Sequence, residues 1–340
     1  MFASLSNFLK EFLPSRNVMP ARWAAFAPPR PSLQAFGIND FLNLKIPPRE
    51  MLLNPILPER SLAMLYAPRG IGKTLLGLSI GLAVASGGPL LRWTAPNPRR
   101  VLYVDGEMPL ASLQERLRAI ALGLGRGIPN EGFRILAADG ADGGINLGSE
   151  EGQRLLEPLF DNINLLILDN LSTLCTTGSE SASDAWVPMQ NWLLKLRRQG
   201  TAVLFIHHAG TNGRQRGTSR REDALDTVIA LRRPEDYSPE QGARFEIHFE
   251  KLRNRTDDRG AIAFEVSLES FAVGGGHDAM RWSSRDLVAP ILKRAAALFA
   301  DAMTVREVAA TLRISKSEAG RLRARVLDDG LLVLDQTAVQ

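Results

Sequence analysis

The sequence predicts an α/β fold, in which helices flank a mostly parallel sheet and a small helical domain follows at the C-terminus. Apolar runs alternate with helical patterns from Ser61 to about Ser270, which is typical of a parallel sheet covered by helices. Four of these runs are continuously apolar, as expected for strands that are buried on both faces. The glycine-rich stretch YAPRGIGKT, residues 66–74, lies between a predicted strand and a predicted helix.

Each strand prediction rests on a short apolar run that ends in polar or turn residues. The runs are SLAMLYA (61–67), RRVLYVDG (99–106), FRILAA (133–138), NLLILD (164–169) and TAVLFIHH (201–208). Helical spacing of apolar residues predicts helices over residues 73–85, 110–124, 150–160 and 183–199. The run DTVIAL then leads into two alternating segments, ARFEIHFEKLRN and AIAFEVSL, which predict an antiparallel hairpin around Gly260.

The two ends of the chain differ from this core in composition. Residues 1–36 are proline-rich and irregular, which predicts an arm that is flexible or docks on a neighbouring subunit. The three glycines Gly274–Gly276 predict a linker, so we expect a core domain over residues 37–273 and a C-terminal region over 274–340. In that region we expect a helix over 286–300, and then a helix, a turn, a second helix and a strand.

The composition is that of a soluble globular protein, with 340 residues, 45% hydrophobic and 23% charged. The net charge of +4 permits contact with nucleic acid but does not demonstrate it. Cys175 is the only cysteine, so the sequence predicts neither an internal disulfide nor a zinc site and favours a reducing cytoplasm. We also expect no secretory signal and no membrane span, because no apolar run is long enough.

The stretch YAPRGIGKT predicts a phosphate-binding loop rather than a simple glycine-rich turn. Such a loop needs glycines that let backbone N–H groups converge on oxyanions, a lysine for the phosphates and a hydroxyl for Mg²⁺. Lys73 and Thr74 supply the last two, and Ala67 stands where the first glycine is usual. We therefore expect ATP and Mg²⁺ as cofactors. The expected nucleotide contacts are Ala67, Pro68, Arg69, Gly70, Ile71, Gly72, Lys73, Thr74 and Leu75.

Hydrolysis needs further groups at the carboxyl edge of the sheet. Asp169 ends the run LLILD and is the expected partner of Thr74 in the Mg²⁺ shell. Glu107 follows VLYVDG and is the expected base that polarises the attacking water, while Asp105 is a competing carboxylate that could instead orient the turn. Of the paired histidines that end TAVLFIHH, we favour His207 as a sensor of the γ-phosphate.

Together these motifs resemble those of the RecA-like ATPases, in particular the plasmid RepA-type hexameric helicases. The resemblance covers roughly residues 36–269. It separates the chain from AAA+ ATPases, in which the catalytic glutamate adjoins the Mg²⁺ aspartate, because here Asn170 follows Asp169. It implies an ATP-hydrolysing DNA-processing motor, such as a replicative helicase of a plasmid or other mobile element. The alternatives are a RecA-like repair or recombination ATPase that does not unwind DNA, and a nucleotide-switched DNA-binding regulator.

The resemblance also implies residues that act on a neighbouring subunit. Arg216 lies in RGTS, which looks like the RG-[ST]-S segment of RepA-type proteins, and Lys251-Leu-Arg253 looks like the lysine-x-arginine element of DnaB-type helicases. By residue type alone, Lys251 and Arg253 are also compatible with the charged end of a solvated strand. Arg216 is also compatible with a surface loop or with a contact to DNA phosphates. The resemblance thus implies a homo-oligomer, with a hexamer expected, single-stranded DNA as a partner, and replication or loading proteins as further partners.

The C-terminal segment resembles a winged-helix or helix-turn-helix unit. Its second predicted helix carries Lys316, Arg321, Arg323 and Arg325 on or near it. In a DNA reader such a helix enters the major groove. Modules of this kind also mediate protein contacts, so DNA contact is the favoured of two expectations.

Overall fold

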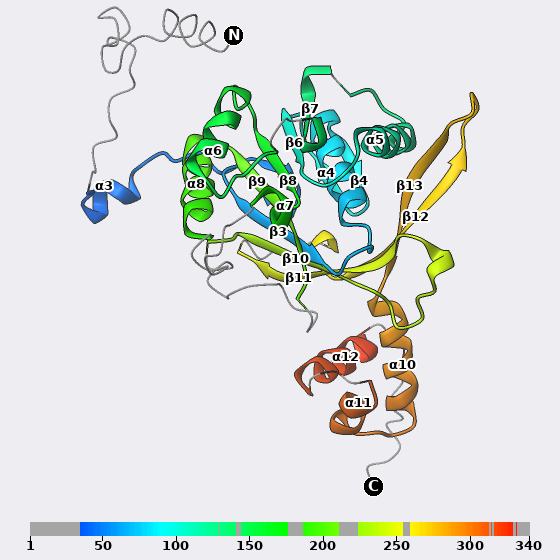
Figure 1. Cartoon of the computed structure of the whole chain (residues 1–340). Helices are drawn as coiled ribbons and strands as arrows, with labels where there is room; N and C mark the ends of the chain where they lie inside the picture. Colours follow the sequence, from blue (N-terminus) through cyan, green and yellow to red (C-terminus); the bar gives the residue numbers. More distant parts are fainter. Residues whose placement is uncertain are drawn as a thin grey trace, which may run out of the picture. The chain divides into compact units, whose positions relative to one another are not determined.

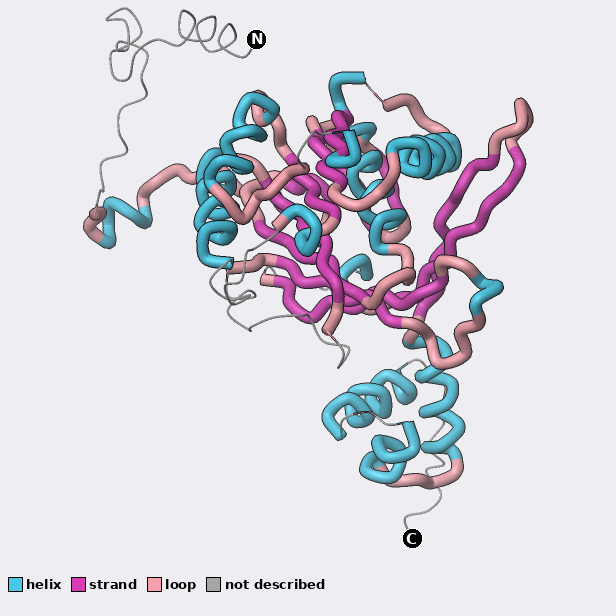
Figure 2. The backbone as a smooth tube through the Cα atoms, viewed as in Figure 1, coloured by secondary structure: helices cyan, strands magenta, loops and turns pink. Residues whose placement is uncertain are grey.

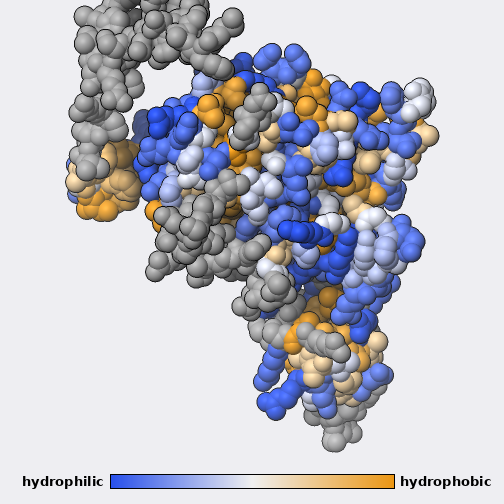
Figure 3. All heavy atoms as spheres, in the orientation of Figure 1, coloured by the Kyte–Doolittle hydropathy of each residue, from blue (hydrophilic) through white to orange (hydrophobic). Residues whose placement is uncertain are grey.

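The computed structural model describes residues 35–128, 130–140, 144–175, 186–210, 224–253, 259–312, 314, 316–328 and 331. The chain divides into two compact units, Met1–Pro48 and Arg49–Gln340. The predicted arm lies almost entirely outside the described residues. The described part of the first unit holds one short helix, α3 (Ile38–Leu42). The large apolar side chains of this part are exposed, and Figure 3 shows orange gathered over α3. They are Phe36, Ile38, Phe41, Leu42, Leu44 and Ile46.

The second unit is built on a mixed sheet in which the described residues form nine strands (Figure 1). Six neighbouring strands, from β10 to β7, run parallel, and β11, β12 and β13 continue the sheet in antiparallel pairs. In spatial order the strands are β13 (Asp278–Asp286), β12 (Phe264–Ala272), β11 (Arg244–Leu252), β10 (Thr227–Arg232), β3 (Leu62–Ala67), β9 (Ala202–His208), β8 (Leu165–Asp169), β6 (Val101–Asp105) and β7 (Phe133–Ala137).

Helices cover both faces of the parallel part of the sheet, as the continuously apolar runs predicted (Figure 2). One face packs against α4 (Lys73–Ser86) and α5 (Leu110–Leu124), and the other against α6 (Glu150–Leu156), α7 (Leu171–Leu174) and α8 (Trp186–Gln199). Successive residues of β9 alternate between the two cores: Leu204 and Ile206 belong to the first, Val203 and Phe205 to the second. The predicted α/β fold is therefore confirmed.

Short elements complete the unit. Two small antiparallel sheets are formed by β1 (Met51–Leu53) with β2 (Leu57–Pro58) and by β4 (Gly88–Leu90) with β5 (Trp93–Ala95). The 3-10 turns are η1 (Asn130–Gly132), η2 (Ala138–Gly140), η3 (Glu157–Leu159), η4 (Pro239–Gln241) and η5 (Arg259–Ala261). Among the helices described, none is both long and apolar enough to cross a membrane.

A turn between two strands lies where the sequence predicted a linker. Gly274–Gly276 form the turn of a hairpin, because β12 and β13 pair along their whole lengths on either side of it. Three consecutive glycines suit a tight turn with positive φ as readily as a flexible linker, and here φ is 84°, 64° and 74°. The helix expected from residue 286 begins at Val288, since Asp286 still pairs with Phe264. The antiparallel hairpin that was predicted around Gly260 is confirmed as β11 and β12.

Three helices follow the sheet and share a small core of their own. They are α10 (Val288–Ala300), α11 (Val305–Leu312) and α12 (Lys316–Asp328), and they are confirmed as helices (Figure 1). Leu292, Phe299, Val308, Leu322 and Val326 are buried among them. The strand predicted after α12 lies outside the described residues.

The β12–β13 hairpin packs directly on the helices of the first face. Trp282 of β13 donates its indole N–H to Ser79 Oγ of α4, 2.8 Å away. At Gly123 of α5 the approach is closer still, because a Cβ there would lie 1.7 Å from the carbonyl oxygen of Met280. Gly123 is thus required by the contact between α5 and β13.

We predict that Gly123→Ala destabilises the protein by about 2 kcal/mol or more, since the new methyl group forces α5 away from β13. Thermal unfolding followed by circular dichroism measures the loss. Gly127→Ala is the matched control, because a Cβ at Gly127 meets no atom within 4 Å among the described residues. Equal unfolding midpoints for the two variants would contradict this close packing.

Candidate functional site

The turn between β3 and α4 has the backbone of an anion-binding loop. Gly70 and Gly72 adopt φ of 71° and 116°, values that side-chain-bearing residues rarely adopt. Gly72 also lies against β11, where a Cβ would meet the Phe245 ring at 3.0 Å. Helix α4 starts at Lys73 with no capping side chain, so its first N–H groups face the turn. Both glycines predicted in this loop therefore serve its shape.

Lys73 lies along the loop that precedes it. Its ammonium donates hydrogen bonds to the carbonyl oxygens of Ala67 at 3.2 Å and Pro68 at 2.8 Å. Burial lowers the pKa of Lys73, while the carboxylates of Asp169 and Glu107 oppose this shift. A cation held in this way is pre-positioned for a negatively charged group above the glycines.

Asp169 ends β8 beneath the loop and is 4% exposed. Its carboxylate accepts hydrogen bonds from the Thr74 hydroxyl and, at 2.7 Å, from the Tyr103 hydroxyl. Burial raises the pKa of Asp169 to about 6, although these hydrogen bonds act in the opposite direction. The hydroxyl of Thr74 and the carboxylate of Asp169 are thus already in contact.

Asp105 ends the neighbouring strand β6 in register with Asp169 and is 1% exposed. Its Oδ1 accepts the backbone N–H groups of Glu107 at 3.1 Å and Met108 at 2.6 Å, so it orients this turn. Its Oδ2 is buried and makes no hydrogen bond within the described part of the chain. Burial raises the pKa of Asp105.

Glu107 is exposed at the rim of the site, directly after this turn. Its carboxylate accepts a hydrogen bond from the side-chain amide of Asn170, the residue that follows Asp169. A pocket of about 660 Å³ brings these groups together. It is lined by Arg69, Gly70, Gly72, Lys73, Thr74, Leu75, Asp105, Glu107, Met108, Pro109, Arg116, Asp169, Asn170, His208, Ala243 and Met280.

The oxygen donors of the pocket suit Mg²⁺, which prefers hydroxyl, carboxylate and phosphate oxygens. Thr74 and Asp169 would hold the ion, and Asp105 offers a buried oxygen beside them. Across the described ranges no three His, Cys, Asp or Glu side chains gather into a metal site by themselves. Proteins commonly bind Mg²⁺ through one or two carboxylates together with substrate phosphates.

Comparison with known families gives a match over more than half of the chain. Residues 27–214 match the family model AAA_25, described as an AAA domain. The chain belongs to this family. It is a P-loop ATPase domain with a RecA-like core, and the match contains the phosphate loop, Glu107 and Asp169.

Two similar solved structures share little sequence identity with this chain. The crystal structure of the RadB recombinase is 16% identical with a TM-score of 0.42, and the alignment covers 62% of this chain and 88% of that one. The flagellar accessory protein FlaH from Methanocaldococcus jannaschii is 8% identical with a TM-score of 0.45, covering 67% and 90%. No curated protein matches the sequence. These similarities are too weak to bear on what the AAA_25 domain acts on.

The paired histidines that end β9 of this AAA_25 domain lie differently with respect to the pocket. His208 lines the pocket, whereas His207 is buried and does not. Strand alternation explains the difference, because His208 follows Ile206 on the α4 face while His207 shares the other face with Phe205. His208 and not His207 therefore lines the pocket, and the role of His207 as a sensor of the γ-phosphate stays a prediction.

Lys251 and Arg253 lie at the opposite edge of the sheet from the pocket. Leu252 pairs with Thr227, which in turn pairs with Ala63 near the start of β3, while the phosphate loop follows the other end of that strand. The Nε of Arg253 lies 3.8 Å from the buried carboxylate of Asp226. Neither cation lines the pocket of its own chain. Arg216 lies outside the described residues.

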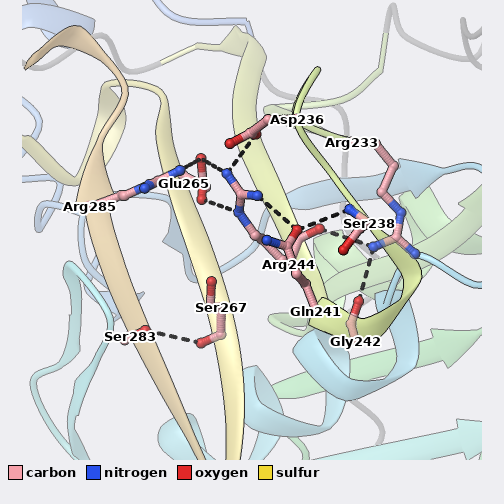
Figure 4. Close-up of polar contacts among 10 residues, drawn as sticks. All are labelled: Arg233, Asp236, Ser238, Gln241, Gly242, Arg244, Glu265, Ser267, Ser283 and Arg285. Carbon is pink, nitrogen blue, oxygen red and sulfur yellow. Dashed lines mark hydrogen bonds and ion pairs between the residues drawn. The ribbon is translucent and has the colours of Figure 1, made fainter. Parts of the chain in front are cut away.

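Arg233 connects the phosphate loop to the segment between β10 and β11. Its guanidinium donates to the carbonyl oxygens of Gly70 at 2.9 Å, Gly242 at 3.1 Å and Arg244 at 3.0 Å. It also lies over the Tyr237 ring, 3.7 Å from the centroid. Figure 4 shows Arg233 beside Gly242 at the end of this segment. The loop's shape thus depends on residues more than 160 positions downstream.

A buried ion pair supports the same segment. Arg244 and Glu265 are joined by two hydrogen bonds of 2.6 and 3.3 Å, and the same carboxylate accepts from Arg285 at 2.8 Å (Figure 4). Arg244 also donates to Asp236 at 2.8 Å. These contacts tie β11, β12 and β13 together where β11 meets Gly72. Removing one partner would leave a buried charge uncompensated.

Several residues that line or contact the pocket were not predicted from sequence. Asn170 directly follows Asp169, so its position was a usable signal. Tyr103 lies inside an apolar run and Arg116 lies in a predicted helix, so neither stands out in the sequence. Arg233 and Met280 reach the site only through the tertiary fold and carried no local signal.

We predict that Asp169→Asn stabilises the nucleotide-free protein above pH 6. The raised pKa means that the folded state holds a proton between about pH 3.8 and 6 that the unfolded state has released, so wild-type stability falls as pH rises through this window. Above pH 6 the buried, ionised carboxylate lowers the free energy of unfolding by the full amount, up to about 3 kcal/mol. Unfolding midpoints at pH 8 and pH 4 measure it: the variant should gain at pH 8 and not at pH 4. Equal gains at both values would contradict the assignment.

Proposed function

We propose that this chain is an ATP-hydrolysing, oligomeric DNA-processing motor, most similar in kind to the RepA-type replicative helicases of plasmids or mobile elements. The observation that carries the proposal is the pocket at which Lys73, Thr74, Asp169 and Glu107 meet. Phosphoryl transfer depends on positioning and on charge stabilisation, and these four side chains supply a cation, a hydroxyl and two carboxylates.

Each of these residues would have a distinct role in hydrolysis. Lys73 leaves the carbonyl groups of its own loop and neutralises charge on the β- and γ-phosphates. Mg²⁺, when bound by Thr74 and Asp169, supplies further charge compensation on those phosphates. Glu107 accepts the proton of the attacking water, and its exposed position at the rim supports this role.

A role for Arg253 or Lys251 in trans is supported by their separation from their own pocket. A cation at the far edge of the sheet can complete only a neighbour's site, where it stabilises charge on the transferred phosphoryl group. Arg216 remains the other candidate for this finger. Either assignment requires a ring or filament of identical subunits, and we propose a hexamer.

A nucleotide-switched DNA-binding regulator is the second candidate. Helices α10, α11 and α12 share an independent core, and α12 carries Lys316, Arg321, Arg323 and Arg325. A motor and a regulator differ in whether DNA accelerates ATP turnover and whether turnover separates strands.

We predict that single-stranded DNA stimulates ATP hydrolysis and that Glu107→Gln lowers the rate by about 10² or more while ATP binding persists, because general-base catalysis is lost. Steady-state ATPase and strand-displacement assays, with and without DNA, measure these effects. Glu115→Gln on α5 serves as the matched control, since Glu115 is exposed and does not line the pocket. Absence of DNA stimulation would favour the regulator, and unwinding by the Glu107 variant would refute its role as base.

We further predict that mixing Lys73→Ala subunits with Arg253→Ala subunits restores part of the activity, although each variant alone is inactive. In a mixed ring some interfaces pair an intact loop with an intact arginine, and removal of such an arginine costs on the order of 10³ in rate. ATPase activity is measured as a function of the mixing ratio. Mixed rings that form, as shown by native mass spectrometry, and yet stay inactive would refute the role of Arg253.

A further inference from the structure

Asn170 makes contacts from both ends of its side-chain amide. Its Oδ1 accepts the backbone N–H groups of Ser172 at 3.0 Å and Thr173 at 3.3 Å, and so caps α7. Its Nδ2 donates to the carboxylate of Glu107. The residue is 2% exposed, and the cap fixes its oxygen, so the nitrogen is directed at Glu107.

The turn that carries Glu107 also packs on α7. A Cβ on Gly106 would lie 2.6 Å from Thr173 Oγ1 and 2.8 Å from the Leu174 side chain, so only a glycine fits. The N–H of Gly106 donates to the Asp169 carbonyl oxygen at 2.7 Å. Leu171 and Leu174 anchor α7 in the core. The turn that carries Glu107 is therefore packed directly against α7.

We propose that Asn170 is a positioning residue that restrains Glu107 and makes hydrolysis responsive to α7. The inference rests on the proposed ATPase function. A carboxylate oxygen that accepts a hydrogen bond from an amide has less capacity to accept the proton of water, so this bond holds the base back until it is broken. Displacement of α7, or a nucleotide that draws Glu107 towards the pocket, breaks the bond. Water then transfers a proton to Glu107 as its oxygen bonds to the γ-phosphorus, the bond from that phosphorus to the β–γ bridging oxygen breaks, and ADP and inorganic phosphate leave.

The variant Asn170→Ser separates the two roles of the amide. A serine hydroxyl accepts hydrogen bonds as an N-cap, so α7 keeps its cap, but its shorter side chain does not reach Glu107. We expect kcat in the absence of DNA to rise roughly tenfold, because one hydrogen bond to a charged group is lost. KM for ATP should change less than about twofold and the unfolding midpoint should stay unchanged, as neither the loop nor the cap is altered.

Two further variants complete the test. Asn170→Ala removes both the cap and the contact with Glu107, and should show the same gain in kcat with a lower unfolding midpoint. Ser149→Ala removes the cap of α6, where Ser149 Oγ accepts the N–H of Gly152 at 3.2 Å, and should leave kcat unchanged. The double variant Asn170→Ser, Glu107→Gln should be as inactive as Glu107→Gln alone.

A kcat for Asn170→Ser that equals or falls below that of wild type overturns the proposal, while the ATPase assignment stands. Wild-type protein that binds ATP and never hydrolyses it would instead refute the proposed function, and with it any restraint on a base. The wild-type rate, measured first, distinguishes these two failures.

Discussion

The site depends on one alignment within the sheet, which sets Asp105 and Asp169 side by side at the ends of β6 and β8. Parallel pairing brings both carboxylates to the same edge, and the Gly106 N–H to Asp169 carbonyl hydrogen bond continues the pairing one residue further. A slip of one residue would turn one of the carboxylates to the opposite face. Because both are buried, their negative charge is costly until a cation compensates it. The two buried carboxylates at this edge therefore favour the binding of a metal ion at the expense of the protein's stability.

Support for this edge comes from residues far along the chain. Arg233 holds the carbonyl oxygen of Gly70, and Trp282 holds Ser79 of α4, so strands late in the sequence restrain the loop and the helix that bind the nucleotide. The Arg244–Glu265 pair keeps these strands in register where β11 meets Gly72. The phosphate loop therefore depends on contacts with these later strands to keep its shape.

Prediction from sequence succeeded where the physical signal was local. Strands β3, β6, β8 and β9 are short apolar runs with polar ends, and α5 was predicted with both of its boundaries, because these patterns lie in adjacent residues. The rule that parallel strands gather their carboxyl ends at one edge correctly predicted that Lys73, Glu107 and Asp169 share a pocket.

Prediction failed where tertiary contacts decide. The hairpin at Gly274–Gly276 and the contribution of Met280 to the pocket depend on which surfaces meet in the folded chain. Contacts across 160 or more residues leave no periodic trace in one sequence, and a run of glycines has the same composition in a turn as in a linker.

The hairpin of β12 and β13 also bears on how far the folded ATPase core extends along the chain. Similarity to the family ends at residue 214, yet β10, which pairs with β3, and Trp282, which meets α4, both come later. An excised domain with the family's boundaries would leave β3 as an exposed, fully apolar edge strand, a template for aggregation. During synthesis, too, the ATPase core stays incomplete until the last third of the chain has been made. The segment that matches the family model is thus shorter than the segment that folds.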